Sequence, residues 1–172
     1  MRSNNSKLIF IILGGPGYGK TTLVNYLTKK RKIDLVFEDF AYKRDNKKFE
    51  SKVLREVIKC RHSKKRIAVV CRRTREINHN WDFRTNHNVT WLLVSLQNFE
   101  IPDLVQLGLD SYNLKKFQSL WAESIQKKTK TRPYLSITIG KDGLIKNEIS
   151  SFYKVNNKVA QTIKPAIPDR KP

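Results

Sequence analysis

The chain has 172 residues, which is enough for one domain with a hydrophobic core and too few for two. Its 35 lysines and arginines outnumber 15 aspartates and glutamates, and the net charge of +20 is larger than solubility requires. This excess predicts a polyanionic partner, and nucleic acid fits best because the basic residues are spread along the whole chain. No apolar run approaches the roughly 20 residues of a membrane span, so we expect a soluble protein.

The cysteines and histidines do not form a metal-binding pattern. Cys60 and Cys71 lack a CxxC spacing, and the nearby histidines do not fall at the spacing of a zinc site. We therefore expect reduced thiols and a cytoplasmic location.

The first half of the chain predicts alternating strands and helices. Residues 8–13 form a short continuous apolar run, which is typical of a central parallel strand rather than of a signal peptide. A helix is predicted over residues 20–30, with basic residues at its C-terminal end, where the helix dipole favours them. A strand over residues 34–37 precedes a polar loop, and apolar residues at helical spacing predict a second helix over residues 47–60.

The second half continues this alternation and ends in a hairpin. Apolar runs predict strands over residues 66–71 and 89–94, and Pro102 opens a helical segment. A helix with one apolar stripe is predicted over residues 111–128. Two further strands, 134–139 and 144–149, would be joined by a hairpin turn rich in glycine.

The order of these elements indicates an α/β fold with three layers. Its sheet would be mostly parallel, with the C-terminal hairpin as an antiparallel margin. We expect residues 1–155 to form this domain and residues 156–172, which contain several prolines, to form a tail.

Residues 14–21 match the pattern G-x-x-x-x-G-K-[ST] between a predicted strand and a predicted helix, the context that a P-loop requires. Glycines let the backbone N–H groups curl around a phosphate, and the helix N-terminus adds positive potential. Lys20 is expected to reach the β- and γ-phosphates of ATP and the Thr21 hydroxyl to bind Mg²⁺, with Thr22 pointing elsewhere. The predicted nucleotide-binding residues are Gly14, Gly15, Pro16, Gly17, Tyr18, Gly19, Lys20, Thr21 and Thr22.

Two carboxylates end the predicted strand at 34–37 and are candidates for the hydrolytic step. Such a pair can hold the water shell of Mg²⁺ and polarise the attacking water. We assign Glu38 to the metal and Asp39 to the water. The alternative is two solvated carboxylates in a turn, which are common where strands end.

The order of motifs over residues 8–95 resembles the FtsK–HerA superfamily of DNA-pumping ATPases, which includes small viral genome-packaging ATPases. The resemblance rests on the P-loop, the acids, and the stretch that begins at Cys60-Arg61-His62 and ends at Arg84-Thr85-Asn86. It implies a RecA-like core that assembles as a ring and moves double-stranded DNA with ATP. Glu38 follows Lys20 by only 18 positions, so one strand of larger members is absent here. If the acids belonged to that strand instead, they would not be the catalytic pair.

The resemblance also assigns functions to four arginines. In the family, one strand lies between the strand before the P-loop and the strand that ends in the catalytic acids. This middle strand ends in a polar sensor residue, and Arg72 or Arg73 matches that position. Arg61 and Arg84 match basic positions that reach the γ-phosphate bound by a neighbouring subunit. For each arginine the alternative is a contact with the nucleic-acid backbone or a solvated charge.

Together these features predict an ATP-driven translocase of double-stranded DNA of the genome-packaging type, located in the host cytoplasm or the virion. Its expected partners are further copies of the chain in a ring and a capsid or portal-like protein. Two alternatives stay open, a small-molecule P-loop kinase and a nucleic-acid-binding protein that binds nucleotide without hydrolysis. The net charge favours the motor over the kinase, whose substrates are small.

Overall fold

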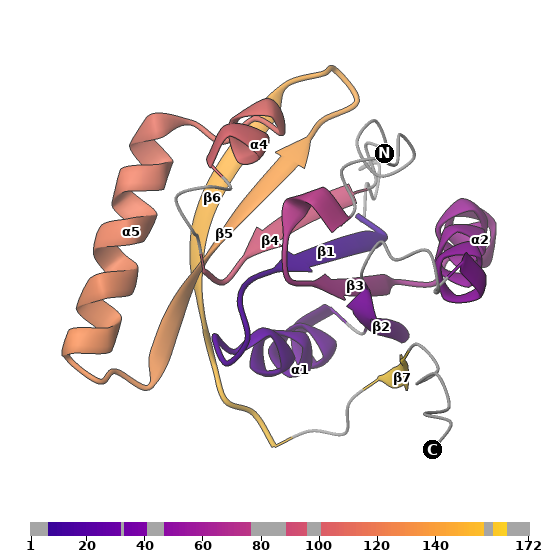
Figure 1. Ribbon diagram of the computed structural model, residues 1–172, viewed down its shortest axis with the longest axis horizontal. Helices are drawn as coiled ribbons and strands as arrows, with labels where there is room; N and C mark the ends of the chain where they lie inside the picture. Colours follow the sequence, from indigo (N-terminus) through magenta and orange to yellow (C-terminus); the bar gives the residue numbers. More distant parts are fainter. Residues whose placement is uncertain are drawn as a thin grey trace, which may run out of the picture.

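The computed structural model describes residues 7–31, 33–40, 47–76, 89–95, 101–156 and 160–164, excluding the side chains of Arg31, Asp39 and Arg75. These residues contain a seven-stranded sheet in the order β6-β5-β4-β1-β3-β2-β7 (Figure 1). The strands are β1 Ile9–Leu13, β2 Leu35–Phe40, β3 Ile67–Cys71, β4 Val89–Leu93, β5 Thr131–Ile139, β6 Ile145–Tyr153 and β7 Gln161–Ile163.

The centre of the sheet is parallel, as the apolar runs predict. All residues of β1, β3 and β4 are buried, because they lie in the middle of the sheet with helices packed on both of its faces. β1 lies between β3 and β4, and Leu13 is in register with both Cys71 and Leu93. The neighbouring strands therefore end at the same level.

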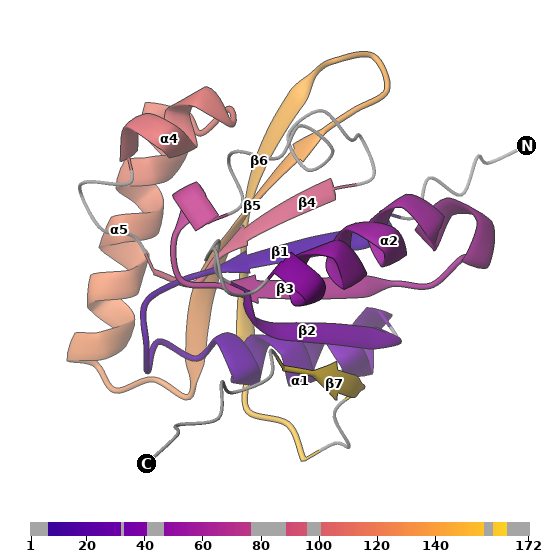
Figure 2. The same ribbon diagram turned by 45° about the vertical axis from the view of Figure 1, so that its right-hand side comes forward.

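Helices lie on both faces of this sheet and divide the core in two (Figures 1 and 2). On one face pack α2 (Lys47–Ser63), α4 (Ile101–Gln106) and α5 (Ser111–Gln126), which contribute Phe49, Val53, Leu104 and Phe117 to one cluster. On the other face packs α1 (Lys20–Arg31), whose Leu23, Val24 and Leu27 meet alternate residues of the central strands. Apolar residues at helical spacing thus face the sheet from both sides.

The β5–β6 hairpin is antiparallel, as expected, and longer than its sequence pattern suggests. β5 pairs with β4, and β6 pairs with β5 from Thr131↔Tyr153 to Ile139↔Ile145. The far end of β6 reaches α1, where the Tyr153 and Tyr26 ring centroids lie 5.1 Å apart (Figure 1). This end of the hairpin closes the α1 side of the core.

The last strand, β7, has no counterpart in the sequence predictions, which placed only a tail after residue 155. Gln161–Ile163 adds in parallel to β2, with Phe37 opposite Ile163. The chain therefore returns to the β2 edge of the sheet after its last hairpin. No helix in the described ranges is long and apolar enough to cross a membrane.

Candidate functional site

The predicted site residues meet where the parallel strands end. Because Leu13, Cys71 and Leu93 share one level, the segments after β1, β3 and β4 begin side by side. β2 ends nearby, with Phe40 in register with Cys71. Ligands of open α/β sheets bind at this carboxyl edge. The segment after β1, residues 14–19, is called the glycine-rich loop below.

The glycine-rich loop is held against the end of β4. A Cβ atom on Gly14 would lie 2.3 Å from Cγ2 of Val94, so only glycine fits there without a shift. The Gly15 N–H donates to the buried Oγ of Ser95 at 3.0 Å. The sequence analysis did not select Ser95, although a polar residue at the end of an apolar parallel strand is a signal that could have identified it.

The outer part of the loop has a backbone shape that glycine favours. Gly17 and Gly19 have φ angles of 77° and 92°. A Cβ on Gly17 would meet no atom within 4 Å, so the loop is open at this point. Positive φ angles beside a helix N-terminus turn the backbone toward the space in front of the helix.

Helix α1 begins directly at the loop and brings Lys20 to it. The Leu23 N–H donates to the Gly19 carbonyl at 2.9 Å and starts the helical ladder. The Lys20 ammonium group donates to the carbonyl oxygens of Gly14 and Gly15 at 2.6 and 2.8 Å. Thr21 is exposed in the first turn of α1. One cation, one exposed hydroxyl and a helix N-terminus therefore share this corner, which suits an anion.

Two aromatic side chains from distant parts of the chain border the loop. The Tyr18 and Trp121 ring centroids lie 5.6 Å apart, which joins the loop to α5. On the other side, a Cβ on Gly19 would lie 3.5 Å from the ring of Phe152 in β6. Sequence reasoning missed both contacts, because they depend on how the hairpin and α5 pack.

Glu38 lies near the end of β2 and is largely buried. Its side chain is 17% exposed, and its Oε2 lies 3.4 Å from Nζ of Lys164, just after β7. β3 separates β2 from β1, so Glu38 stands two strands away from the strand that carries the loop. Asp39 belongs to β2, but its side chain is outside the described part of the structure.

The four arginines of the sequence analysis do not all meet at this edge. Arg72 and Arg73 are exposed after β3, and their backbone N–H groups donate to Oε2 of Glu76 at 2.9 and 3.3 Å. Arg61 is in the last turn of α2, which runs back from the end of β2 to the start of β3. It therefore lies toward the opposite edge of the sheet. Arg84 is outside the described residues.

Two groups with shifted pKa values lie away from this edge. Burial raises the pKa of the Cys60 thiol, which packs in the core beneath α2. Partial burial, with Lys141 nearby, lowers the pKa of Lys7, whose ammonium group donates to the Ile139 carbonyl. Both shifts follow from structural packing, so neither group is a candidate for catalysis at the loop.

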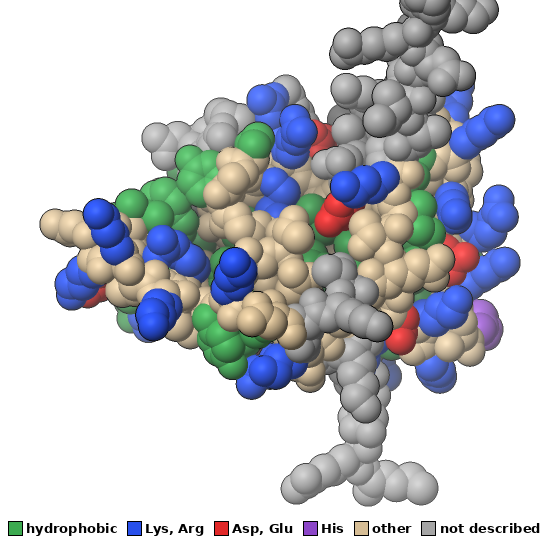
Figure 3. Space-filling model, turned by 90° about the horizontal axis from the view of Figure 1, so that it is seen from below, with side chains coloured by type: hydrophobic (Ala, Val, Ile, Leu, Met, Phe, Trp, Pro, Cys, Tyr) green, Lys and Arg blue, Asp and Glu red, His purple; other side chains and the backbone are tan. Residues whose placement is uncertain are grey.

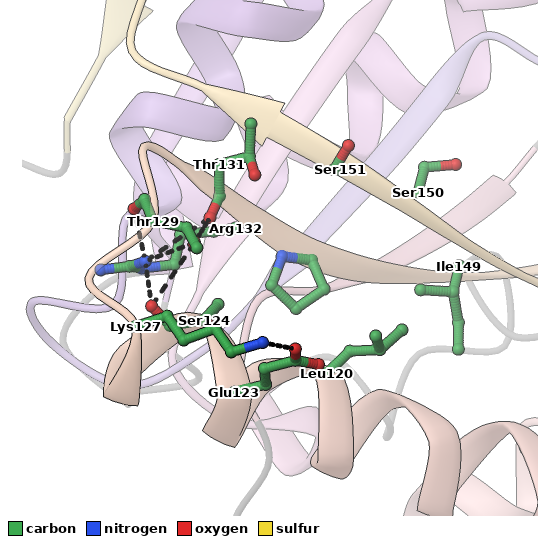
Figure 4. Close-up of a pocket in the computed structure, with 11 residues that line it drawn as sticks. Leu120, Glu123, Ser124, Lys127, Thr129, Thr131, Arg132, Ile149, Ser150 and Ser151 are labelled. Carbon is green, nitrogen blue, oxygen red and sulfur yellow. Dashed lines mark hydrogen bonds and ion pairs between the residues drawn. The ribbon is translucent and has the colours of Figure 1, made fainter.

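A pocket of about 360 Å³ lies between the end of α5 and the β5–β6 hairpin (Figure 4). Serine and threonine residues, including Ser124 and Thr129, line it together with the apolar Leu120, Pro133 and Ile149. The Arg132 guanidinium points to the carbonyl oxygens of Ser124 and Thr129, at 2.9 and 2.8 Å. Lys127 pairs with Glu123. The positively charged groups of Arg132 and Lys127 thus already have partners within the protein. Sequence reasoning did not identify this pocket.

Comparison with protein-family models, curated proteins and solved structures finds no match, so the arrangement of residues at the carboxyl edge is the basis for a functional conclusion.

Proposed function

We propose that this chain is an ATP-hydrolysing translocase of double-stranded DNA with a RecA-like P-loop core, acting in viral genome packaging. One observation carries the proposal. The glycine-rich loop joins a fully buried central strand to the N-terminus of a helix, and Lys20 lies over the loop. This combination of glycines, helix end and lysine suits the phosphates of a nucleoside triphosphate.

The residues present fit ATP and Mg²⁺. The space beside Gly17 is open, so a phosphate oxygen can approach the backbone of the glycine-rich loop closely at that residue. In the proposed complex the ammonium group of Lys20 would bind the phosphates in place of the loop carbonyls, and Thr21 and Glu38 would hold Mg²⁺ directly or through water. The cation would neutralise phosphate charge, and Asp39 would orient the attacking water.

The strand order supports the finer assignment to the FtsK–HerA type. β3 lies between β1 and β2, which is where the resemblance expects the strand that ends in a sensor residue. Arg72 follows β3 at the level where the glycine-rich loop follows β1. Arg72 or Arg73 therefore suits the sensor role. The proposal that Arg61 or Arg84 contacts the nucleotide of a neighbouring subunit in a ring comes from the resemblance alone.

Charge supports DNA as the transported polymer. The chain has a net charge of +20, and contacts from lysine and arginine to phosphates bind nucleic acid of any sequence. A packaging motor also needs a docking partner, for which a capsid or portal-like protein is proposed. The expected location is the host cytoplasm or the virion.

The test is ATP turnover with Mg²⁺, measured with and without double-stranded DNA. Stimulation by DNA supports the motor. Turnover only with a nucleoside or another small acceptor would identify a kinase instead. Nucleotide binding without turnover would identify a nucleotide-dependent nucleic-acid-binding protein. Native mass measured with and without ATP tests the ring, because a strict monomer in every condition contradicts an arginine supplied by a neighbour.

A further inference from the structure

Helix α2 presents a continuous line of basic side chains to solvent. Lys48, Lys52, Arg55 and Lys59 are all exposed and follow one another at intervals of four, three and four residues. At 3.6 residues per turn these four positions fall within an arc of about 60° and extend over about 17 Å of the helix. They are called the α2 stripe below.

The opposite face of α2 fixes the stripe in place. Phe49, Val53, Val57 and Cys60 are buried and belong to the core cluster on this face of the sheet. The rings of Phe49 and Phe37 pack edge to face, with centroids 5.9 Å apart. The stripe therefore stands on a helix whose orientation the core determines, rather than on a loop.

The surroundings of the stripe are basic as well. Residues 47–66 contain nine lysines and arginines but only two glutamates, Glu50 and Glu56, and both glutamates are partly buried. None of the four stripe residues forms an ion pair with another described residue. Figure 3 shows lysine and arginine side chains gathered on the flank where α2 lies in Figure 1. Such a concentration of positive charge attracts a polyanion.

We propose that the α2 stripe is a docking surface for the phosphate backbone of double-stranded DNA. Duplex DNA carries one negative charge per about 1.7 Å of its axis, so about ten phosphates lie within the length of the stripe. A rigid, straight row of cations matches a stiff rod-like polymer better than a flexible strand. Side chains of this kind contact phosphates rather than bases, so the contact would be independent of DNA sequence.

The position of the stripe separates this contact from the nucleotide site. The helix begins near the end of β2 and runs to the start of β3, so the stripe leads away from the glycine-rich loop. The inference extends the proposed function, from which it takes DNA as the partner. It can nevertheless fail independently, because DNA binding is measured without nucleotide.

The experiment compares two variants of the full chain from which equal positive charge has been removed. The stripe variant is K48Q/K52Q/R55Q/K59Q. The control variant removes four exposed lysines, two within α5 and two just after it, as K115Q/K116Q/K128Q/K130Q. Fluorescence anisotropy of a labelled 20-base-pair duplex gives the affinity of each protein at several salt concentrations, and circular dichroism verifies folding.

The stripe variant is expected to bind about 100-fold or more weakly at 0.1 M salt, with a salt slope smaller by about three to four. The control should change the slope by less than one, and both variants should keep the ATP turnover that the wild type has without DNA. Equal losses in the two variants, no loss in the stripe variant, or no duplex binding by the wild type would overturn the inference. If the stripe variant lost affinity for single-stranded DNA but kept its affinity for the duplex, the assignment to duplex DNA would be overturned. Failure of the proposed function is a separate result, namely the absence of ATP turnover in the wild type.

Discussion

The ammonium nitrogen of Lys164 lies 3.4 Å from Oε2 of Glu38 and so connects the C-terminal end of β7 to the acid near the end of β2. The two residues are 126 positions apart in sequence. Pairing of β7 with β2 brings them together, with Phe37 and Ile163 as neighbours in register. Lys164 thus forms an ion pair with one oxygen of the Glu38 carboxylate, which is proposed to hold Mg²⁺.

Removal of this lysine should favour Mg²⁺ binding. In Lys164→Gln the carboxylate of Glu38 loses a competing cation, and we expect the Mg²⁺ concentration for half-maximal ATP turnover to fall by up to about fivefold. The effect is small because the Lys164 side chain is 63% exposed, and such ion pairs contribute at most about 1 kcal/mol. A Mg²⁺ titration of the ATPase rate measures it. Lys146→Gln, which removes the lysine of another exposed ion pair, is the control. An unchanged titration in Lys164→Gln would contradict the competition.

Replacement of Lys20 should stop hydrolysis without unfolding the protein. Lys20→Ala removes the cation beside the glycine-rich loop, and loss of one such group at a reacting centre lowers turnover on the order of 100-fold or more. Steady-state ATPase assays measure the loss, and thermal unfolding shows whether the fold is kept. Lys29→Ala, an exposed site in the same helix, should retain wild-type turnover. Turnover in Lys20→Ala at the wild-type rate would exclude the P-loop assignment.

The close approach of the glycine-rich loop to β4 predicts a specific stability defect. In Gly14→Ala the new methyl group meets Cγ2 of Val94, and overpacking of this kind costs about 1–3 kcal/mol. Denaturant unfolding measures the free energy. In a double-mutant cycle, Val94→Ala should recover part of the loss in Gly14→Ala but none of the loss in Gly17→Ala, where the backbone angle is strained in open space. Strict additivity of Gly14→Ala and Val94→Ala would show that the two residues do not collide.

The N-terminus of α5 should contribute a pH-dependent stability. Hydrogen bonds from the backbone N–H and then the side chain of Asn113 lower the pKa of Asp110, the N-cap residue. A lowered folded-state pKa means that this stabilisation is fully present above the ordinary Asp value near 4 and is lost as pH falls through the lower value. The stability difference between wild type and Asp110→Ala should therefore shrink with acid in urea unfolding from pH 6 to 2.5. Gln118→Ala, exposed in the middle of α5, should show a constant difference. A constant difference for Asp110→Ala as well would contradict the assignment.

Local sequence patterns were sufficient for most of the secondary structure. The apolar runs predicted β1, β3 and β4, and the helical spacing of apolar residues predicted α1, α2 and α5. These patterns work because burial on both faces of a strand, or on one face of a helix, leaves a direct periodic trace in the chain. The last residues of β6, Ser150 to Tyr153, were missed because their pairing depends on β5 rather than on their own composition.

The chain by itself determined the glycine-rich loop, because its glycines, lysine and threonine are contiguous and require only a strand before them and a helix after them. Only the tertiary structure decided what surrounds that loop. Three contacts join residues that are 80 or more positions apart in sequence: Ser95 with Gly15, Trp121 with Tyr18, and Lys164 with Glu38. Contacts between distant segments arise from the order and register of strands, and a periodic pattern within one element carries no information about its neighbours.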